Sequence, residues 1–189
     1  MRRRRRVTAF LWVVVAVFVA LYIAGGLVAT RTARGRASTA VAAADGIGVP
    51  AELGRKPPTR ALDRWRAQLT TACQRRNADV YELTLRQQSM RPLGPRAYAE
   101  RVVAGWTKFA RAASSLRAPP GYEAAARWVA RVHRAKGRLL HAERDAVFAR
   151  DPESVTAAHA AYVRLSNRTN PGFIRLGLFW CGQYLARAE

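Results

Sequence analysis

The side chains that most often carry enzyme chemistry are few in this 189-residue chain and lie far apart in the sequence. The histidines are His133, His141 and His159. No two of them are three or four positions apart, the spacing that puts two ligands on one helix face, and neither Glu143 nor Asp145 completes a known metal pattern with them. No serine lies in a Gly-x-Ser-x-Gly setting, and no glycine-rich phosphate loop is present. The sequence therefore predicts no catalytic residue, no metal site and no cofactor.

Positive charge is the strongest feature of the composition, with 33 Lys and Arg against 12 Asp and Glu and a net charge of +21. Residues 59–189 alone hold 23 basic and 10 acidic side chains. Four arginines in this part, at spacings of four, three and four, form one ridge on a helix: Arg127, Arg131, Arg134 and Arg138. Such a ridge fits the anionic groups of lipids or envelope polymers. The alternative interpretation is a solvated face without a ligand.

Two further charges, Lys136 and Glu143, lie at or beside the apolar stripe of the same predicted helix and would form a polar pocket opposite Gly137 if they pointed inward. Ala135 and Ala142 can take the inner positions instead. We expect the alanines inside and both charges at the surface, because buried charges without partners are costly.

The N-terminal stretch Val7–Ala29 has no charged residue and is long enough to be a membrane-spanning helix. It follows the run Arg2, Arg3, Arg4, Arg5, Arg6 and precedes Arg31, Arg34 and Arg36. Because the denser basic cluster tends to stay inside, we expect a cytoplasmic tail at residues 1–6 and an extracytoplasmic C-terminal domain. The apolar stretch is too long for a cleaved signal peptide, and the residues after the arginine run do not fit a twin-arginine signal.

Small residues recur every four positions inside the predicted span, at Ala16, Ala20 and Ala24. Such a stripe lets two membrane helices approach closely, so a homodimer is one interpretation and a lone anchor is the other.

Residues 30–58 are rich in Ala, Gly and Pro and predict a linker, although residues 37–44 suit a short extension of the membrane helix. In residues 59–189 the apolar side chains recur at helical spacing, and no segment alternates like a strand. We expect four helices, over about 59–90, 95–116 and 122–150 and from Asp151-Pro152-Glu153 onward, where an N-cap and a first-turn proline begin the last helix.

The last helix contains Pro171, which should break or kink it, but the apolar stripe keeps one phase from Val155 to Tyr184. We therefore expect a kinked continuous helix. The predicted fold is all-α, with a transmembrane helix, a linker and an antiparallel up-down four-helix bundle. Most aromatic side chains of the domain should lie in its core: Trp65, Trp106, Trp128, Trp180, Tyr81, Tyr98, Tyr122, Tyr162 and Tyr184.

The chain has two cysteines, Cys73 in the first helix of the domain and Cys181 near the end of the last. In an up-down bundle the start of the first helix and the end of the last helix lie at the same end, so the two sulfurs reach similar heights. Gly177, one turn before Cys181, would let the helices approach closely. A disulfide is therefore expected if the domain lies outside the cytoplasm, and two buried free thiols if it lies inside.

A cysteine in the first helix together with the closing segment Gly177-Leu178-Phe179-Trp180-Cys181-Gly182 resembles a group of uncharacterised actinobacterial proteins. These are secreted or single-pass membrane proteins with small helical domains whose first and last helices are joined by a disulfide. The resemblance implies the same fold and location, and it brings no catalytic residue.

Together these features predict a non-enzymatic, membrane-tethered helical module of the cell envelope. It would bind another envelope protein, or an anionic polymer or lipid surface, and nucleic acid is not expected as a partner of an outer domain. The alternative is an extracytoplasmic accessory or sensor subunit of a transporter or envelope enzyme.

Overall fold

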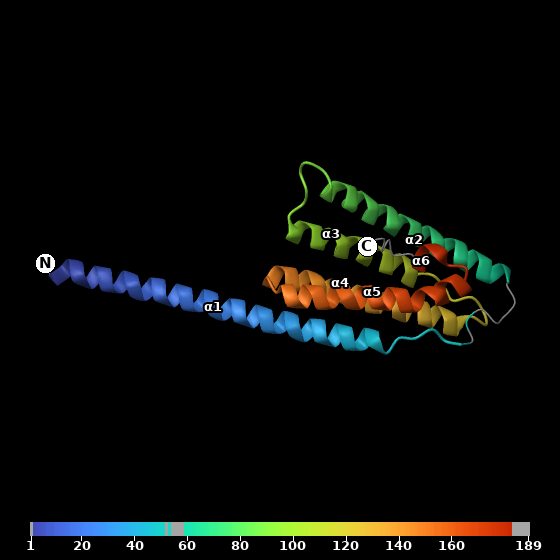
Figure 1. Ribbon diagram of the computed structural model, residues 1–189, viewed down its shortest axis with the longest axis horizontal. Coiled ribbons are helices and arrows are strands. Elements are labelled where there is room, and N and C mark those ends of the chain that lie inside the picture. The colour runs from blue at the N-terminus through green and yellow to red at the C-terminus, as the bar shows by residue number, and fades with distance from the viewer. Residues whose placement is uncertain (1, 52, 54–58, 183–189) are drawn as a thin grey trace.

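The computed structural model describes residues 2–51, 53 and 59–182, with the side chains of residues 2–18 and 20–23 outside that description. The described residues form six helices and no strand: α1 (Arg2–Asp45), α2 (Arg60–Gln87), α3 (Pro95–Ser114), α4 (Glu123–Ala149), α5 (Pro152–Arg175) and α6 (Phe179–Gly182). Consecutive helices from α2 to α5 lie side by side and run antiparallel (Figure 1). The prediction of an all-helical bundle is therefore confirmed.

Local sequence explains where the bundle helices begin. The Thr59 hydroxyl accepts a hydrogen bond from the Leu62 backbone N–H at 3.1 Å, and α3 starts with Pro95 at its first position. The Asp151 carboxylate caps α5, where it accepts from the Ser154 backbone N–H at 3.3 Å. The predicted start of the last helix is thus correct.

The predicted linker over residues 30–58 is wrong for its first half, because α1 continues to Asp45 and packs against α4 and α5. A stripe of alanines at spacings of four, three and four forms the contact: Ala33, Ala37, Ala40 and Ala44. Their small side chains bring α1 close to Leu139 and Leu165. After Asp45 the chain stays on the bundle, since the Trp128 indole N–H donates to the Gly48 carbonyl at 2.8 Å.

Within the described residues, no helix combines the length and the apolar character needed to cross a bilayer. Most side chains of the predicted span Val7–Ala29 lie outside that description, including those of Ala16 and Ala20. The membrane anchor and the dimer stripe therefore stay predictions.

The last helix differs from its prediction beyond Pro171. Helix α5 passes through Pro171 and ends at Arg175, so the predicted continuous helix to Tyr184 is wrong. Gly177 has φ +70°, and the backbone N–H of Leu178 donates to the Phe173 carbonyl at 2.8 Å, which closes a Schellman turn. The glycine thus ends the helix through its conformation and does not serve close packing as predicted. The short helix α6 follows.

Candidate functional site

The predicted disulfide between Cys73 and Cys181 is confirmed, with the two Cα atoms 5.1 Å apart. Both cysteines are buried, and the bond ties α2 to α6. Both sulfurs also lie within 4.8 Å of a His133 ring nitrogen. Since the sulfurs are bonded to each other, neither is a thiolate that would bind a metal ion here.

The predicted basic ridge on α4 lies at the surface. All four of its arginines are exposed: Arg127, Arg131, Arg134 and Arg138. None takes part in the ion pairs found among the described residues. Their charges are therefore available to an external partner, although the geometry assigns them no ligand.

Two of the arginines predicted to flank the membrane have partners within the bundle. Arg34 Nε donates to the Asp151 carboxylate at 2.8 Å, and Arg36 Nη1 donates to the Asp145 carboxylate at 2.6 Å. The hydrogen bond from Arg34 is the main cause that lowers the pKa of Asp151. These pairs join the last third of α1 to the end of α4 and to the start of α5, while Arg31 is exposed.

The expectation that Lys136 lies at the surface is wrong. Its side chain is buried at 2% exposure, beside Ala135, which is also buried, while Glu143 is half-buried. The Lys136 ammonium lies 5.7 Å from the centre of the Tyr162 ring and 5.6 Å from that of Phe173. Aromatic faces therefore surround it in place of a carboxylate.

A second buried cation, Arg76, lies close to Lys136. It belongs to α2, one turn after Cys73, and is 7% exposed. Its Nε and Nη2 atoms donate to the Asn77 side-chain oxygen at 3.1 and 2.6 Å, and its guanidinium carbon lies 5.3 and 4.9 Å from the ring centres of Trp106 and Phe109. Neither Arg76 nor Lys136 forms an ion pair with an acidic side chain of the described residues.

Burial perturbs the titration of this cluster. It lowers the pKa of Arg76, and together with the nearby charge of Arg76 it lowers the pKa of Lys136 from 10.5 to about 7. Burial and the same two cations hold the pKa of His133 well below its usual range, so that the imidazole is neutral. Neither ring nitrogen of His133 has a hydrogen-bond partner among the described residues.

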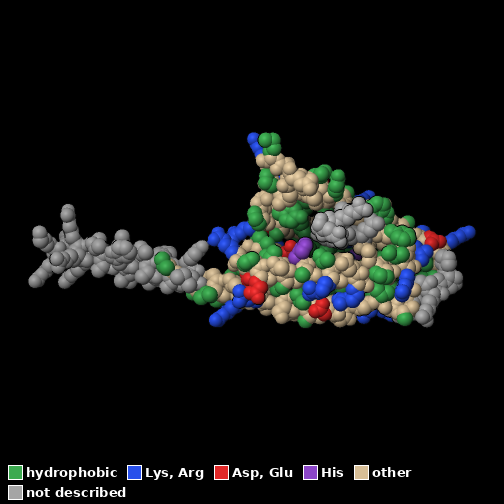
Figure 2. All heavy atoms as spheres, in the orientation of Figure 1, with side chains coloured by type: hydrophobic (Ala, Val, Ile, Leu, Met, Phe, Trp, Pro, Cys, Tyr) green, Lys and Arg blue, Asp and Glu red, His purple; other side chains and the backbone are tan. Residues whose placement is uncertain are grey.

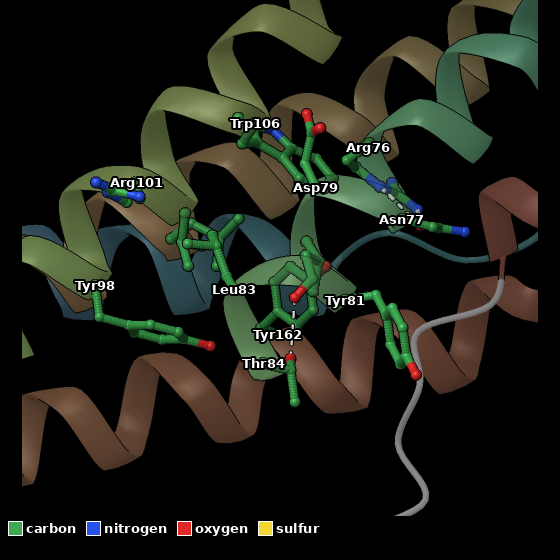
Figure 3. Close-up of a pocket in the computed structure, with 14 residues that line it drawn as sticks. Arg76, Asn77, Asp79, Tyr81, Leu83, Thr84, Tyr98, Arg101, Trp106 and Tyr162 are labelled. Atoms are coloured by element: carbon green, nitrogen blue, oxygen red, sulfur yellow. Dashed lines mark hydrogen bonds between the residues drawn. The ribbon is translucent and has the colours of Figure 1, made fainter. Parts of the chain in front are cut away.

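A cavity of about 310 Å³ lies beside this cluster, between α2 and α3 on one side and α4 and α5 on the other. Figure 3 shows Arg76 and Asn77 at one end, Tyr98 and Arg101 at the other, and Tyr162 between them. Leucine and valine side chains of α2, α3 and α4 complete the wall: Val80, Leu83, Val102 and Leu140. The cavity is thus mainly apolar with a buried cation at one end.

The backbone of α2 lies close to α3 and α6 but not to α4 or α5, and the cavity lies beside its second half. Its first half is buried through Leu62, Trp65, Leu69 and Cys73, whereas Tyr81 and Leu85 in its second half are 57% and 48% exposed. Figure 2 shows the hairpin of α2 and α3 rising from the rest of the molecule.

Gly137 on α4 shapes the cavity wall. A Cβ atom there would lie 2.6 Å from the Trp106 indole nitrogen, so glycine lets the Trp106 ring approach α4 this closely. The aromatic side chains that were predicted to lie in the core differ in exposure. Trp65, Trp128 and Tyr122 are buried as predicted, while Trp180 is 47% exposed and Tyr184 lies outside the described residues.

The predicted site residues thus fall in separate places: the arginine ridge lies on the outer face of α4, and the disulfide lies in the core. Arg76 interrupts the apolar stripe of the first bundle helix in the sequence, and this position is the signal that points to a buried charge. No known protein family, curated protein or solved structure matches this chain.

Proposed function

We propose that the chain is a non-enzymatic module of the cell envelope, tethered to the membrane by Val7–Ala29, with its bundle outside the cytoplasm. In this proposal the ridge Arg127, Arg131, Arg134 and Arg138 binds an anionic polymer or lipid surface that meets the bundle outside the cytoplasm. The N-terminal arginines stay in the cytoplasm.

The observation that carries the proposal is the continuity of α1. One helix runs from the apolar stretch into the bundle, where Ala33, Ala37, Ala40 and Ala44 bury it against α4 and α5. A helix continuous with the anchor holds the bundle at a fixed height, unlike a flexible linker. The disulfide is consistent with an oxidising location outside the cytoplasm.

A second candidate function, an accessory or sensor subunit of a transporter or envelope enzyme, is favoured by one feature. The second half of α2 and the loop after it expose Tyr81, Leu85 and Met90, the last one fully. Exposed apolar side chains near one another are typical of surfaces that bind another protein.

Flotation with anionic vesicles tests the first function. The full chain, held in phosphatidylcholine nanodiscs, is mixed with phosphatidylglycerol vesicles at low and high salt. Changing the four ridge arginines to glutamine should weaken vesicle binding at least tenfold and remove most of its salt dependence. A matched control changes four exposed arginines of α2: Arg60, Arg64, Arg75 and Arg86. Equal losses in both variants would reject the ridge as the binding surface, because total charge would then explain the binding.

A further inference from the structure

We propose that the cavity beneath the α2–α3 hairpin binds a small anionic amphiphile, a carboxylate with a single alkyl chain, whose head group pairs with Arg76. This goes beyond surface binding by the arginine ridge and does not rest on it, because the two sites share no residue.

The first support is the unbalanced charge of Arg76. A buried guanidinium normally has a carboxylate or phosphate partner, because an unpaired buried charge is costly. Here its hydrogen bonds go to one amide oxygen, that of Asn77, and its remaining N–H groups are left for a ligand. The one acidic residue lining the cavity, Asp79, is exposed and forms no ion pair with Arg76.

The second support is the positive charge around the cavity. Lys136 lies behind Tyr162, and Arg101 lies at the end opposite Arg76. Burial lowers the pKa of Lys136, and a bound anion would favour its charged form. These cations all favour an anion over a neutral or cationic ligand.

The third support is the shape and chemistry of the rest of the cavity. At about 310 Å³ it is at the lower end of the range of small-molecule sites, about 300–1,000 Å³. Leu83, Val102, Leu140 and the Trp106 ring offer apolar surface to an alkyl chain, and Tyr98 and Tyr162 offer only phenol groups. A ligand with one charged end and an apolar body matches this distribution, and a single negative charge matches the one arginine at the inner end.

The disulfide and Gly137 keep this arrangement in place. Cys73 is bonded to Cys181 one helical turn before Arg76, which fixes that turn of α2. Gly137 allows the Trp106 ring to lie between Arg76 and α4. The cation is therefore held in position before a ligand binds, which lowers the entropic cost of binding.

Photo-crosslinking tests the proposal. The full chain in phosphatidylcholine nanodiscs is irradiated with a dodecanoic acid that carries a diazirine, and the labelled residues are mapped by mass spectrometry. We expect labels on the cavity-facing parts of α2 and α3, displaced by laurate and not by dodecylamine. Arg76→Met should reduce the labelling at least tenfold, whereas Arg75→Met, which removes an exposed charge one position away, should leave it unchanged.

A second variant distinguishes loss of the binding site from loss of the fold. Val102→Trp fills the cavity and retains Arg76, so it should abolish the same labels, while circular dichroism and the intact disulfide report the fold of both variants. Labelling that survives Arg76→Met, or that dodecylamine displaces as well as laurate does, would overturn the proposal. Stronger displacement by dodecyl phosphate than by laurate would overturn the assignment of a carboxylate head group.

Discussion

The buried ammonium of Lys136 should make the stability of the protein depend on pH in the alkaline range. Its pKa is about 7 in the folded chain, against 10.5 as the ordinary value. Between about pH 7 and about pH 10 the unfolded chain therefore binds a proton that the folded chain does not, so the free energy of unfolding rises with pH. The slope approaches about 1.4 kcal/mol per pH unit, and the full effect is about 5 kcal/mol.

Lys136→Met removes the charge and keeps much of the aliphatic side chain. The groups that face Lys136 come from three helices: Arg76 on α2, His133 on α4, and Tyr162 and Phe173 on α5. None of them offers a carboxylate, so the substitution breaks no ion pair. We expect the variant to be more stable than the wild type by about 1–4 kcal/mol at pH 6. Because only the wild type gains stability when Lys136 loses its proton, this difference should fall to zero or below as the pH approaches 10.

Urea unfolding of the full chain in detergent micelles, followed by tryptophan fluorescence at pH 6, 7, 8 and 9, measures this difference. Lys108→Met on the exposed face of α3 is the matched control and should leave the pH dependence of the wild type intact. The reasoning is refuted if wild type and Lys136→Met keep a constant difference from pH 6 to pH 9. It is refuted equally if the variant is the less stable protein at pH 6.

Three further predictions concern stability and are measured by urea unfolding. Replacing both Cys73 and Cys181 with alanine opens a 108-residue loop and should cost about 4–5 kcal/mol, and a loss below 1 kcal/mol would mean that the bond adds little constraint. Asp151→Ala removes the cap of α5 and should cost about 1 kcal/mol at pH 7, with the difference from wild type shrinking as the pH falls from about 5 to about 2, because the pKa of Asp151 is lowered in the folded chain. Arg150 has φ +56°, so Arg150→Gly should stabilise the fold by about 0.5–1 kcal/mol, and an unchanged midpoint would argue against backbone strain there.

Patterns that depend on neighbouring residues in the sequence predicted the fold well. Asp151-Pro152-Glu153 marked the start of α5, and Pro95 marked that of α3. The spacing of Trp106 and Phe109 placed both on the buried face of α3. The two cysteines could be paired because an up-down topology fixes which helix ends meet. Each of these inferences needs only local chemistry and one assumption about topology.

The features that escaped prediction depend on contacts between distant segments. The alanine stripe of α1 is weakly hydrophobic, so its pattern does not distinguish a linker from a packed helix until α4 and α5 are known. Lys136 and Ala135 are adjacent on one helix, and both are buried because helices pack on two sides of α4. The cavity at Arg76 follows from the incomplete packing of the second half of α2, and no periodicity in the sequence encodes that gap.

The central claim, a bundle outside the cytoplasm on a membrane-spanning N-terminal helix, is tested most directly by labelling introduced cysteines in intact cells. Ser115→Cys lies at the exposed end of α3, and Arg3→Cys lies in the predicted cytoplasmic tail. A membrane-impermeant maleimide should label Ser115→Cys in intact cells and Arg3→Cys only after the membrane is permeabilised. The reverse pattern, or recovery of the full chain in the soluble fraction, would contradict the claim.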